Sequence, residues 1–205
     1  IVYEGNFFRV RKDRVRLPDG GVATREYIRH PGAVVILPLF DDGTVLVERQ
    51  FRYSVKRIFI EFPAGKIDRG EDRLARAKRE LGEETGYTLE IPAGGRDSLE
   101  EKTYDCAARE LEEETGYTAS SWQFVTTIHN AIGYSDEALS IYLARGLHAG
   151  AARLDDEEFI QTFRIPVTEL LDWVRTGQVT DVKTVIGAFW LEKIANGQWD
   201  AEKIV

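Results

Sequence analysis

Several residue types are scarce in this chain of 205 residues, and each scarcity excludes a class of protein. Cys106 is the only cysteine, so neither an intrachain disulfide nor a zinc site of several cysteines can form, and a reducing cytoplasm is the natural compartment. Lysine and arginine number 27 against 35 aspartate and glutamate residues, which gives a formal net charge of -8. Nucleic acids and anionic membranes are bound through basic surfaces. We therefore expect neither of them as a partner.

Long apolar segments are also missing. No run approaches the roughly 20 residues of a membrane-spanning helix, and the first residues do not follow the pattern of a signal peptide. Methionine is absent, so we expect at least an initiator residue ahead of Ile1. The length and a hydrophobic content of 43% suit one globular domain, or one domain with a small appendage.

The residues that are present predict strands interleaved with helices. Residues 6–15 and 22–30 alternate in polarity around the turn at 18–21, which predicts a hairpin. The apolar run at 32–40 and the strand pattern at 44–52 predict a second hairpin. Further strands are expected at 57–65, 121–129 and 139–147, and amphipathic helices near 167–177 and 181–197. This order predicts an α/β domain with a mixed sheet.

An internal repeat lies in the acidic middle of the chain. RELGEETGYT at 79–88 and RELEEETGYT at 109–118 are identical at nine of ten positions. Upstream of them, EFPAG corresponds to EIPAGG, so the two copies span 61–88 and 90–118. The strands on either side are not repeated, which excludes a solenoid. We expect a local duplication of about thirty residues within one domain, of natural or engineered origin.

The repeat gathers glutamates on one face of a helix. In the second copy Glu110, Glu113 and Glu114 follow the spacing i, i+3, i+4. Like charges at this spacing repel by about 0.2 to 0.5 kcal/mol per pair, so the face is unfavourable unless cations occupy it. Magnesium prefers oxygen ligands and is usually held by a few carboxylates and by substrate phosphates. The ordinary alternative is a solvated acidic helix face, and the surrounding pattern decides between the two.

That pattern has the same spacing in both copies. Five residues separate Gly65 from Glu71 and Gly95 from Glu101. Seven more residues lead from each glutamate to the arginine that opens the repeated ten-residue segment, here called the box. Both copies resemble the signature of the Nudix hydrolase family at every constrained position. The resemblance implies a Nudix fold, an α/β/α sandwich with a mixed β-sheet, in which the motif binds Mg²⁺ or Mn²⁺ and activates water. Metal ions would neutralise a diphosphate and lower the pKa of bound water.

Most of the chain resembles the ADP-ribose pyrophosphatase branch of that family. VERQFR and REYIRHPGAV resemble segments that contact substrate there, which implies that Arg52 and Arg25 bind substrate; an ordinary surface salt bridge is the alternative for Arg52. IGYSDE resembles the loop at the terminal ribose, with Glu137 as the participant. Members of the branch exchange N-terminal segments in homodimers. The resemblance therefore implies a homodimer in which 1–31 serves dimerisation or substrate contact ahead of a catalytic domain at 32–205.

The residues favour the second copy as the working one and leave the choice open. Family members usually have small residues just before the box arginine, because that helix face packs on the sheet. Cys106 stands there in the second copy and Arg76 in the first, and a buried arginine would cost several kcal/mol. Gly82 also makes the first helix about 1 kcal/mol less favourable than alanine would. In favour of the first copy, Gly65 follows directly from the preceding strand, whereas the second copy has an additional glycine.

The resemblance assigns roles in either copy. If the second copy works, the carbonyl of Ala93 joins Glu110 and Glu114 as metal ligands, Glu113 and Glu114 take part in catalysis, and Arg109 orients the first glutamate by ion pairing. If the first copy works, the corresponding residues are Ala64, Glu80, Glu83 and Glu84.

A general base is expected from the acidic loop LDDEEF, which follows the strand at 139–147. Glu157 and Glu158 are the first candidates, and Asp155 and Asp156 are the next. A purely structural charge cluster is the alternative. Among the histidines, His30 and His129 adjoin predicted strands and are expected to be structural.

These assignments imply Mg²⁺-dependent hydrolysis of ADP-ribose, or of a related nucleoside diphosphate sugar, to AMP and ribose 5-phosphate. The alternative from another class is a folded nucleotide-binding module in which the duplication has impaired the site. Every glutamate of both boxes is present, which favours the enzyme.

Overall fold

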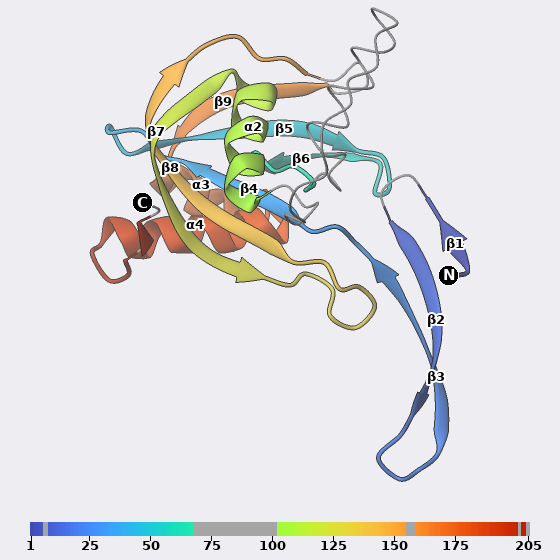
Figure 1. Cartoon of the computed structure of the whole chain (residues 1–205). Helices are drawn as coiled ribbons and strands as arrows, with labels where there is room; N and C mark the ends of the chain where they lie inside the picture. The colour runs from blue at the N-terminus through green and yellow to red at the C-terminus, as the bar shows by residue number, and fades with distance from the viewer. Residues whose placement is uncertain (6–7, 68–101, 155–158, 201, 204–205) are drawn as a thin grey trace, which may run out of the picture.

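The computed structural model of the chain describes residues 1–5, 8–67, 102–154, 159–200 and 202–203. Among these residues the elements form three β-sheets and three helices. Figure 1 shows one small sheet that extends away from a larger body, in which two sheets and the helices pack together.

The small sheet is N-terminal and antiparallel. It consists of β1 (Tyr3–Glu4), β2 (Arg9–Arg16) and β3 (Val22–Arg29), in that order. Strands β2 and β3 pair over their whole length, which confirms the predicted hairpin. Its turn contains Gly20 at φ 88°, a conformation that glycine adopts without strain. Most of the side chains on the hairpin are exposed, and it projects from the body in Figure 1.

The main sheet is mixed and has the order β10-β7-β8-β4. Strand β4 (Ala33–Pro38) runs parallel to β8 (Leu139–Ala149), whereas β7 (Tyr117–Ile128) runs antiparallel to β8. The short strand β10 (Glu202–Lys203) pairs with the outer edge of β7. The mixed sheet predicted from the sequence is confirmed.

A third sheet has β5 (Thr44–Arg52) between β6 (Arg57–Glu61) and β9 (Ile160–Pro166). The prediction that β4 and β5 form a hairpin is wrong. Beyond the turn they share a single bridge, between Leu39 and Val45, because β4 pairs with β8 and both edges of β5 are occupied by β6 and β9. All six residues of β4 are buried, as expected for a parallel strand covered on both faces.

Helices cover both faces of the main sheet. Alternate residues of β4 face two separate apolar cores: Val34 and Ile36 pack with α2 (Thr103–Thr115), whereas Val35 and Leu37 pack with α4. Figure 1 shows α2 on one side of the sheet and the pair α3 and α4 on the other. This is the predicted α/β/α arrangement.

The two C-terminal helices are α3 (Val167–Arg175) and α4 (Val182–Ala195), which confirms both sequence predictions. The side chain of Asp181 accepts from the backbone of Thr184 and so caps α4. Among the described residues no helix is both long and apolar enough to cross a membrane.

Helix α2 belongs to the second copy of the repeat and covers the main sheet. Cys106, Ala107 and Leu111 are completely buried against β4, β7 and β8. The helix ends at Gly116, whose φ of 73° suits glycine. Cys106, which stands where the first copy has Arg76, thus lies at a position that is completely buried against the sheet.

Shortening Leu111 tests this packing. We expect Leu111→Ala to lower the free energy of unfolding by about 2 to 5 kcal/mol, because a fully buried leucine is replaced by a cavity. Urea denaturation measures the effect. Glu112→Ala, on the exposed side of the same helix, is the control and should change stability by no more than about 0.5 kcal/mol. Equal effects of the two substitutions would contradict the placement of α2.

Candidate active site

A pocket of about 660 Å³ opens beside α2. Carboxylates and cations both line it, and few apolar side chains do. The acidic residues are Glu110, Glu113, Glu114, Glu137 and Asp181. The basic residues are Arg52, Lys66, Arg109, Arg153 and Lys183. Such a lining suits a ligand that carries negative charge and is bound together with a cation.

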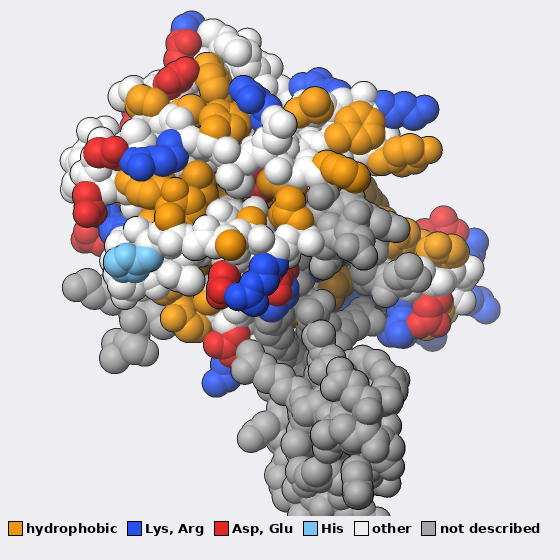
Figure 2. Space-filling view, turned by 90° about the horizontal axis from the view of Figure 1, so that it is seen from above, with side chains coloured by type: hydrophobic (Ala, Val, Ile, Leu, Met, Phe, Trp, Pro, Cys, Tyr) orange, Lys and Arg blue, Asp and Glu red, His pale blue; other side chains and the backbone are white. Residues whose placement is uncertain are grey.

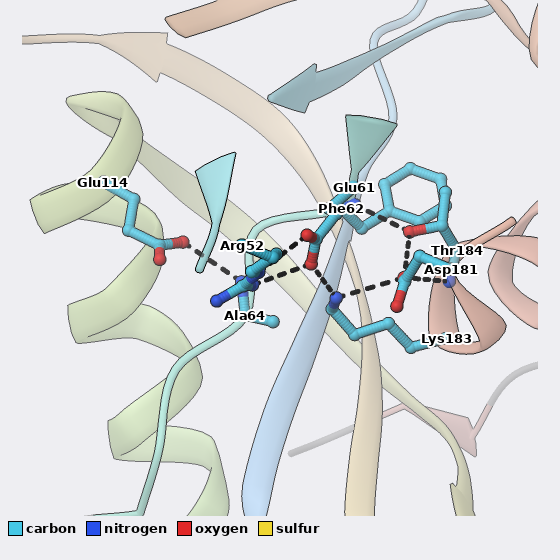
Figure 3. Close-up of polar contacts among 8 residues, drawn as sticks. All are labelled: Arg52, Glu61, Phe62, Ala64, Glu114, Asp181, Lys183 and Thr184. Carbon is cyan, nitrogen blue, oxygen red and sulfur yellow. Dashed lines mark hydrogen bonds and ion pairs between the residues drawn. The ribbon is translucent and has the colours of Figure 1, made fainter. Parts of the chain in front are cut away.

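The segment Pro63–Gly65 forms one wall of the pocket and is bonded on both sides. The carbonyls of Pro63 and Gly65 accept from the backbone of β4, each at 2.9 Å. The N–H of Ala64 points the other way and donates to Glu114 Oε2 at 3.0 Å (Figure 3). In an extended chain the N–H and C=O of one residue point to the same side. The Ala64 carbonyl therefore lies on the side of α2.

Gly65 lies directly against Glu110. A Cβ at position 65 would be 1.6 Å from the Cδ of Glu110, which no side chain can tolerate. Glycine at this position therefore allows the carboxylate to approach the backbone of the loop. Glu110 and Glu114 are largely buried, with side-chain exposure of 13% for Glu110 and residue exposure of 5% for Glu114.

Arg109 bridges the glutamates of its own helix. Its Nη1 lies 3.0 Å from Glu110 Oε1 and 2.7 Å from Glu113 Oε2. A planar guanidinium that contacts two carboxylates restrains both. The contact is the one that an orienting role for Arg109 requires.

The site combines parts of both copies. Ala64 and Gly65 come from the first copy, whereas Glu110 and Glu114 come from the second. The sequence analysis treated each copy as a unit and paired Ala93 with the second helix. Ala93 lies outside the described residues, as do the first-copy glutamates Glu80, Glu83 and Glu84.

A network of ion pairs borders the pocket next to Ala64 (Figure 3). Arg52 donates from Nε to Glu61 Oε1 and from Nη2 to Glu61 Oε2, both at 2.7 Å. The ammonium of Lys183 contacts Glu61 Oε2 as well, and it lies 3.0 Å from Asp181 Oδ2. Burial alone would raise the pKa of the Glu61 carboxyl, but the hydrogen bonds from Arg52 and the charges of Lys183 and Arg52 hold that pKa below its ordinary value.

Burial alone would likewise lower the pKa of the Arg52 guanidinium. The hydrogen bonds and the charge of Glu61, with smaller contributions from Glu48 and Asp181, raise that pKa instead. Arg52 therefore stays charged at any physiological pH.

The loop that carries Glu137 is fastened to the end of β3. The carbonyl of Tyr134 accepts from Ile28, and Asp136 accepts from the backbone of His30 at 2.9 Å. These bonds place Glu137 at the pocket. His30 also borders the pocket, and its Nδ1 accepts from Gly32 at 3.1 Å, which holds the turn before β4.

One expected residue, Arg25, does not line the pocket. Arg25 lies on the exposed face of the N-terminal hairpin, and its nearest partner is the carbonyl of Thr24. The acidic loop residues Glu157 and Glu158 lie outside the described residues, as do Asp155 and Asp156.

Three pocket-side residues were not singled out from the sequence: Glu61, Asp181 and Lys183. Two signals point to them. Asp181 stands three residues before Thr184, the spacing of a helix N-cap. Lys183 is the one charged residue in VKTVIGAFW, and a charge on so apolar a helix start has to find a partner.

The oxygen atoms at the pocket are the kind of ligand that a hard divalent cation prefers. They are the Ala64 carbonyl with Glu110 and Glu114, gathered where Gly65 leaves space. Within the described ranges no three His, Cys, Asp or Glu side chains converge closely enough to form a metal cluster by themselves. A backbone carbonyl and substrate phosphates would complete the coordination, as is usual for Mg²⁺.

One face of the molecule shows a surface of mixed charge. Figure 2 shows acidic and basic side chains next to one another and next to apolar ones on the face seen from above. Among the coloured side chains of that face no extended basic area is visible. This agrees with the net charge of -8.

Two known family models match most of the chain. The model of the Nudix domain matches residues 29–91 and again residues 88–183, and each match contains one copy of the repeated box. The model described as nucleoside diphosphate sugar hydrolase N-terminal domain matches residues 1–28. The chain belongs to the Nudix hydrolase family.

Several proteins of similar sequence have been named for their activity. The chain is 31% identical over 193 residues to an ADP-ribose pyrophosphatase of Bacillus subtilis, covering 93% of this chain and 88% of the relative. It is 31% identical over 199 residues to an ADP-ribose pyrophosphatase of Mycobacterium tuberculosis, covering 96% and 82%. It is also 28% identical over 193 residues to a methanol dehydrogenase activator of Bacillus methanolicus, covering 93% and 88%.

A solved structure supports the fold. The crystal structure of an ADP compounds hydrolase superposes with a TM-score of 0.72 at 20% identity, and the match covers 96% of this chain and 91% of the other. The Nudix fold predicted from the repeated motif is confirmed.

The network around Glu61 predicts a dependence of stability on pH. The pKa of Glu61 is lower in the folded protein than its ordinary value of 4.5, so its stabilisation is present above that value and is lost as the pH falls through the folded value. We expect the free energy of unfolding, measured in urea from about pH 5 to about pH 3, to fall less steeply in Glu61→Gln than in the parent. Parallel curves would contradict the assignment.

Proposed function

We propose that this chain hydrolyses ADP-ribose to AMP and ribose 5-phosphate with Mg²⁺ or Mn²⁺. The proposal rests above all on one contact, the hydrogen bond from Ala64 to Glu114, because it joins the loop of one copy to the helix of the other. The names of the relatives from Bacillus subtilis and Mycobacterium tuberculosis support the substrate. Other nucleoside diphosphate sugars are the same chemical class.

The metal would be held by the Ala64 carbonyl, Glu110 and Glu114. When bound, it supplies positive charge to the diphosphate and lowers the pKa of water. Arg109 keeps Glu110 and Glu113 in place through its two ion pairs. We propose this donor set in place of the pairing of Ala93 with the second helix, because the loop residue bonded to Glu114 is Ala64.

The substrate would lie between the metal site and the pocket's other charged residues. Arg52 offers guanidinium N–H groups to a phosphate, and a planar fork suits that geometry. Glu137 offers a carboxylate to a ribose hydroxyl, and both residues line the pocket. For the general base, Glu157 and Glu158 remain the candidates.

We also propose a cytoplasmic homodimer. The N-terminal hairpin projects from the body and most of its side chains are exposed, so in a dimer it would be free to reach a second copy (Figure 1). Arg25 would then contact substrate in the partner's pocket rather than in its own.

Two matched substitutions test the function and the working helix together. We expect Glu114→Gln to lower kcat/KM for ADP-ribose, measured with Mg²⁺, by on the order of 100-fold or more, because a charged group at the reacting centre is lost. Glu84→Gln, the corresponding change in the first copy, should leave the parent's activity unchanged.

The opposite pattern would show that the first copy works. Absence of turnover in the parent would contradict the proposed hydrolysis. If the parent then still bound ADP-ribose in calorimetry, the nucleotide-binding module would replace the enzyme.

Removing one repeat tests whether the site is composite. Deletion of 68–97 joins Ile67 to Ser98 and again leaves five residues between Gly65 and Glu101. Both halves of the described site are kept, and shortening a loop changes its closure free energy by only about 0.6 kcal/mol per halving. Because neither half of the described site is changed, we expect kcat/KM to stay within about threefold of the parent.

Deletion of 88–117 is the matched control, since it also removes thirty residues and leaves one complete box. It keeps the helix of the first copy instead, so Arg76 would replace the fully buried Cys106. We expect this variant to be less stable by several kcal/mol in urea denaturation. A deletion of 68–97 that was inactive although folded would contradict the composite site.

A further inference from the structure

The carboxylate of Glu61 is almost completely buried, with 2% exposure, and it lies between two cations (Figure 3). Arg52 binds both of its oxygens, and Lys183 binds Oε2 from the other side. A buried charge is stable only where it is paired and hydrogen-bonded. Glu61 meets this condition through these two partners.

Lys183 is fixed by the start of α4. Its ammonium lies 3.0 Å from Asp181, whose carboxylate also accepts from the N–H of Thr184 at 3.0 Å and from its hydroxyl at 2.6 Å. The hydroxyl oxygen of Thr184 in turn accepts from the backbone of Phe62 at 3.0 Å. Strand β6 and helix α4 are therefore joined at two successive residues, Glu61 and Phe62. The position of Glu61 is set by the packing of the C-terminal helix.

Arg52 uses only one edge of its guanidinium in this network. The Nε and Nη2 atoms face Glu61, which leaves the edge that carries Nη1. The side chain is 40% exposed and lines the pocket. Because the guanidinium is planar and rigid, fixing one edge fixes the direction of the other.

We propose that Glu61 is a positioning residue that directs Arg52 toward an anionic substrate, and that Lys183 holds Glu61 in the position from which it does so. The statement about substrate rests on the proposed function, in which Arg52 contacts phosphate. The statement about Arg52 and Glu61 concerns the chain alone.

Positioning and simple electrostatics predict opposite results for one substitution. The four charges of Arg52, Lys183, Glu61 and Asp181 sum to zero. Glu61→Gln makes the sum positive, so electrostatics alone would strengthen the binding of an anion. If Glu61 positions Arg52, the same substitution weakens binding because the guanidinium is no longer held in one orientation.

The experiment compares steady-state kinetics of ADP-ribose hydrolysis in four proteins. We expect Glu61→Gln to raise KM about tenfold, as for the loss of one well-placed charged hydrogen bond, with kcat within about twofold. The double variant Glu61→Gln with Lys183→Met removes both charges of the ion pair between these residues. Its KM should match that of Glu61→Gln. Lys193→Met, in the last turn of α4 and away from the pocket, is the control and should match the parent.

An unchanged or lower KM in Glu61→Gln would overturn the proposal. So would a double variant whose KM differs clearly from that of Glu61→Gln, because Lys183 would then act independently of Glu61.

A second readout does not depend on turnover. In protein labelled with ¹⁵N-arginine, the Nε–H signal of Arg52 is identified by its absence in Arg52→Lys. We expect it to exchange slowly in the parent and to be lost to fast exchange in Glu61→Gln. A parent that failed to hydrolyse ADP-ribose would contradict the proposed function only. An Arg52 signal unaffected by Glu61→Gln would contradict the positioning role whatever the activity.

Discussion

The segment Pro63–Gly65 is held between a strand and a helix by backbone hydrogen bonds on its two sides. Bonds from β4 to the carbonyls of Pro63 and Gly65 fix it to the sheet, and the bond from Ala64 to Glu114 fixes α2 to it. The position of Glu110 depends on the same contact, because only a glycine at 65 lets that carboxylate approach. These few bonds therefore fix the wall of the pocket, the place of its oxygen donors and the position of α2.

This construction explains how a duplicated motif is compatible with one site. The site needs a short loop that continues from β6 and a helix with small residues toward the sheet, and it does not need both from one copy. The first copy supplies the loop because Glu61 and Phe62 lead directly into it. The second supplies the helix because Cys106 fits a completely buried position where the first copy has Arg76. Thirty additional residues between them are inexpensive, since closure entropy grows only logarithmically with length.

The sequence was sufficient for the fold and for part of the site. Alternation and turn residues predicted the N-terminal hairpin, and the repeated motif predicted the Nudix fold. Pairing was harder: β4 looked like the partner of β5, but strand order depends on contacts between β4 and β8, about a hundred residues apart. The composite site could not be predicted. The two copies have nearly the same sequence, and what separates them is how well each helix packs against the sheet. Lys183 was missed since its partner Glu61 is 122 residues away.

The most direct test of the composite site is a crystal structure with Mn²⁺ and a nonhydrolysable ADP-ribose analogue, in which anomalous scattering locates the metal. Our account predicts a peak at coordination distance from the Ala64 carbonyl and from the carboxylates of Glu110 and Glu114. A peak beside Ala93, or at the first-copy glutamates Glu80 and Glu84, would contradict it.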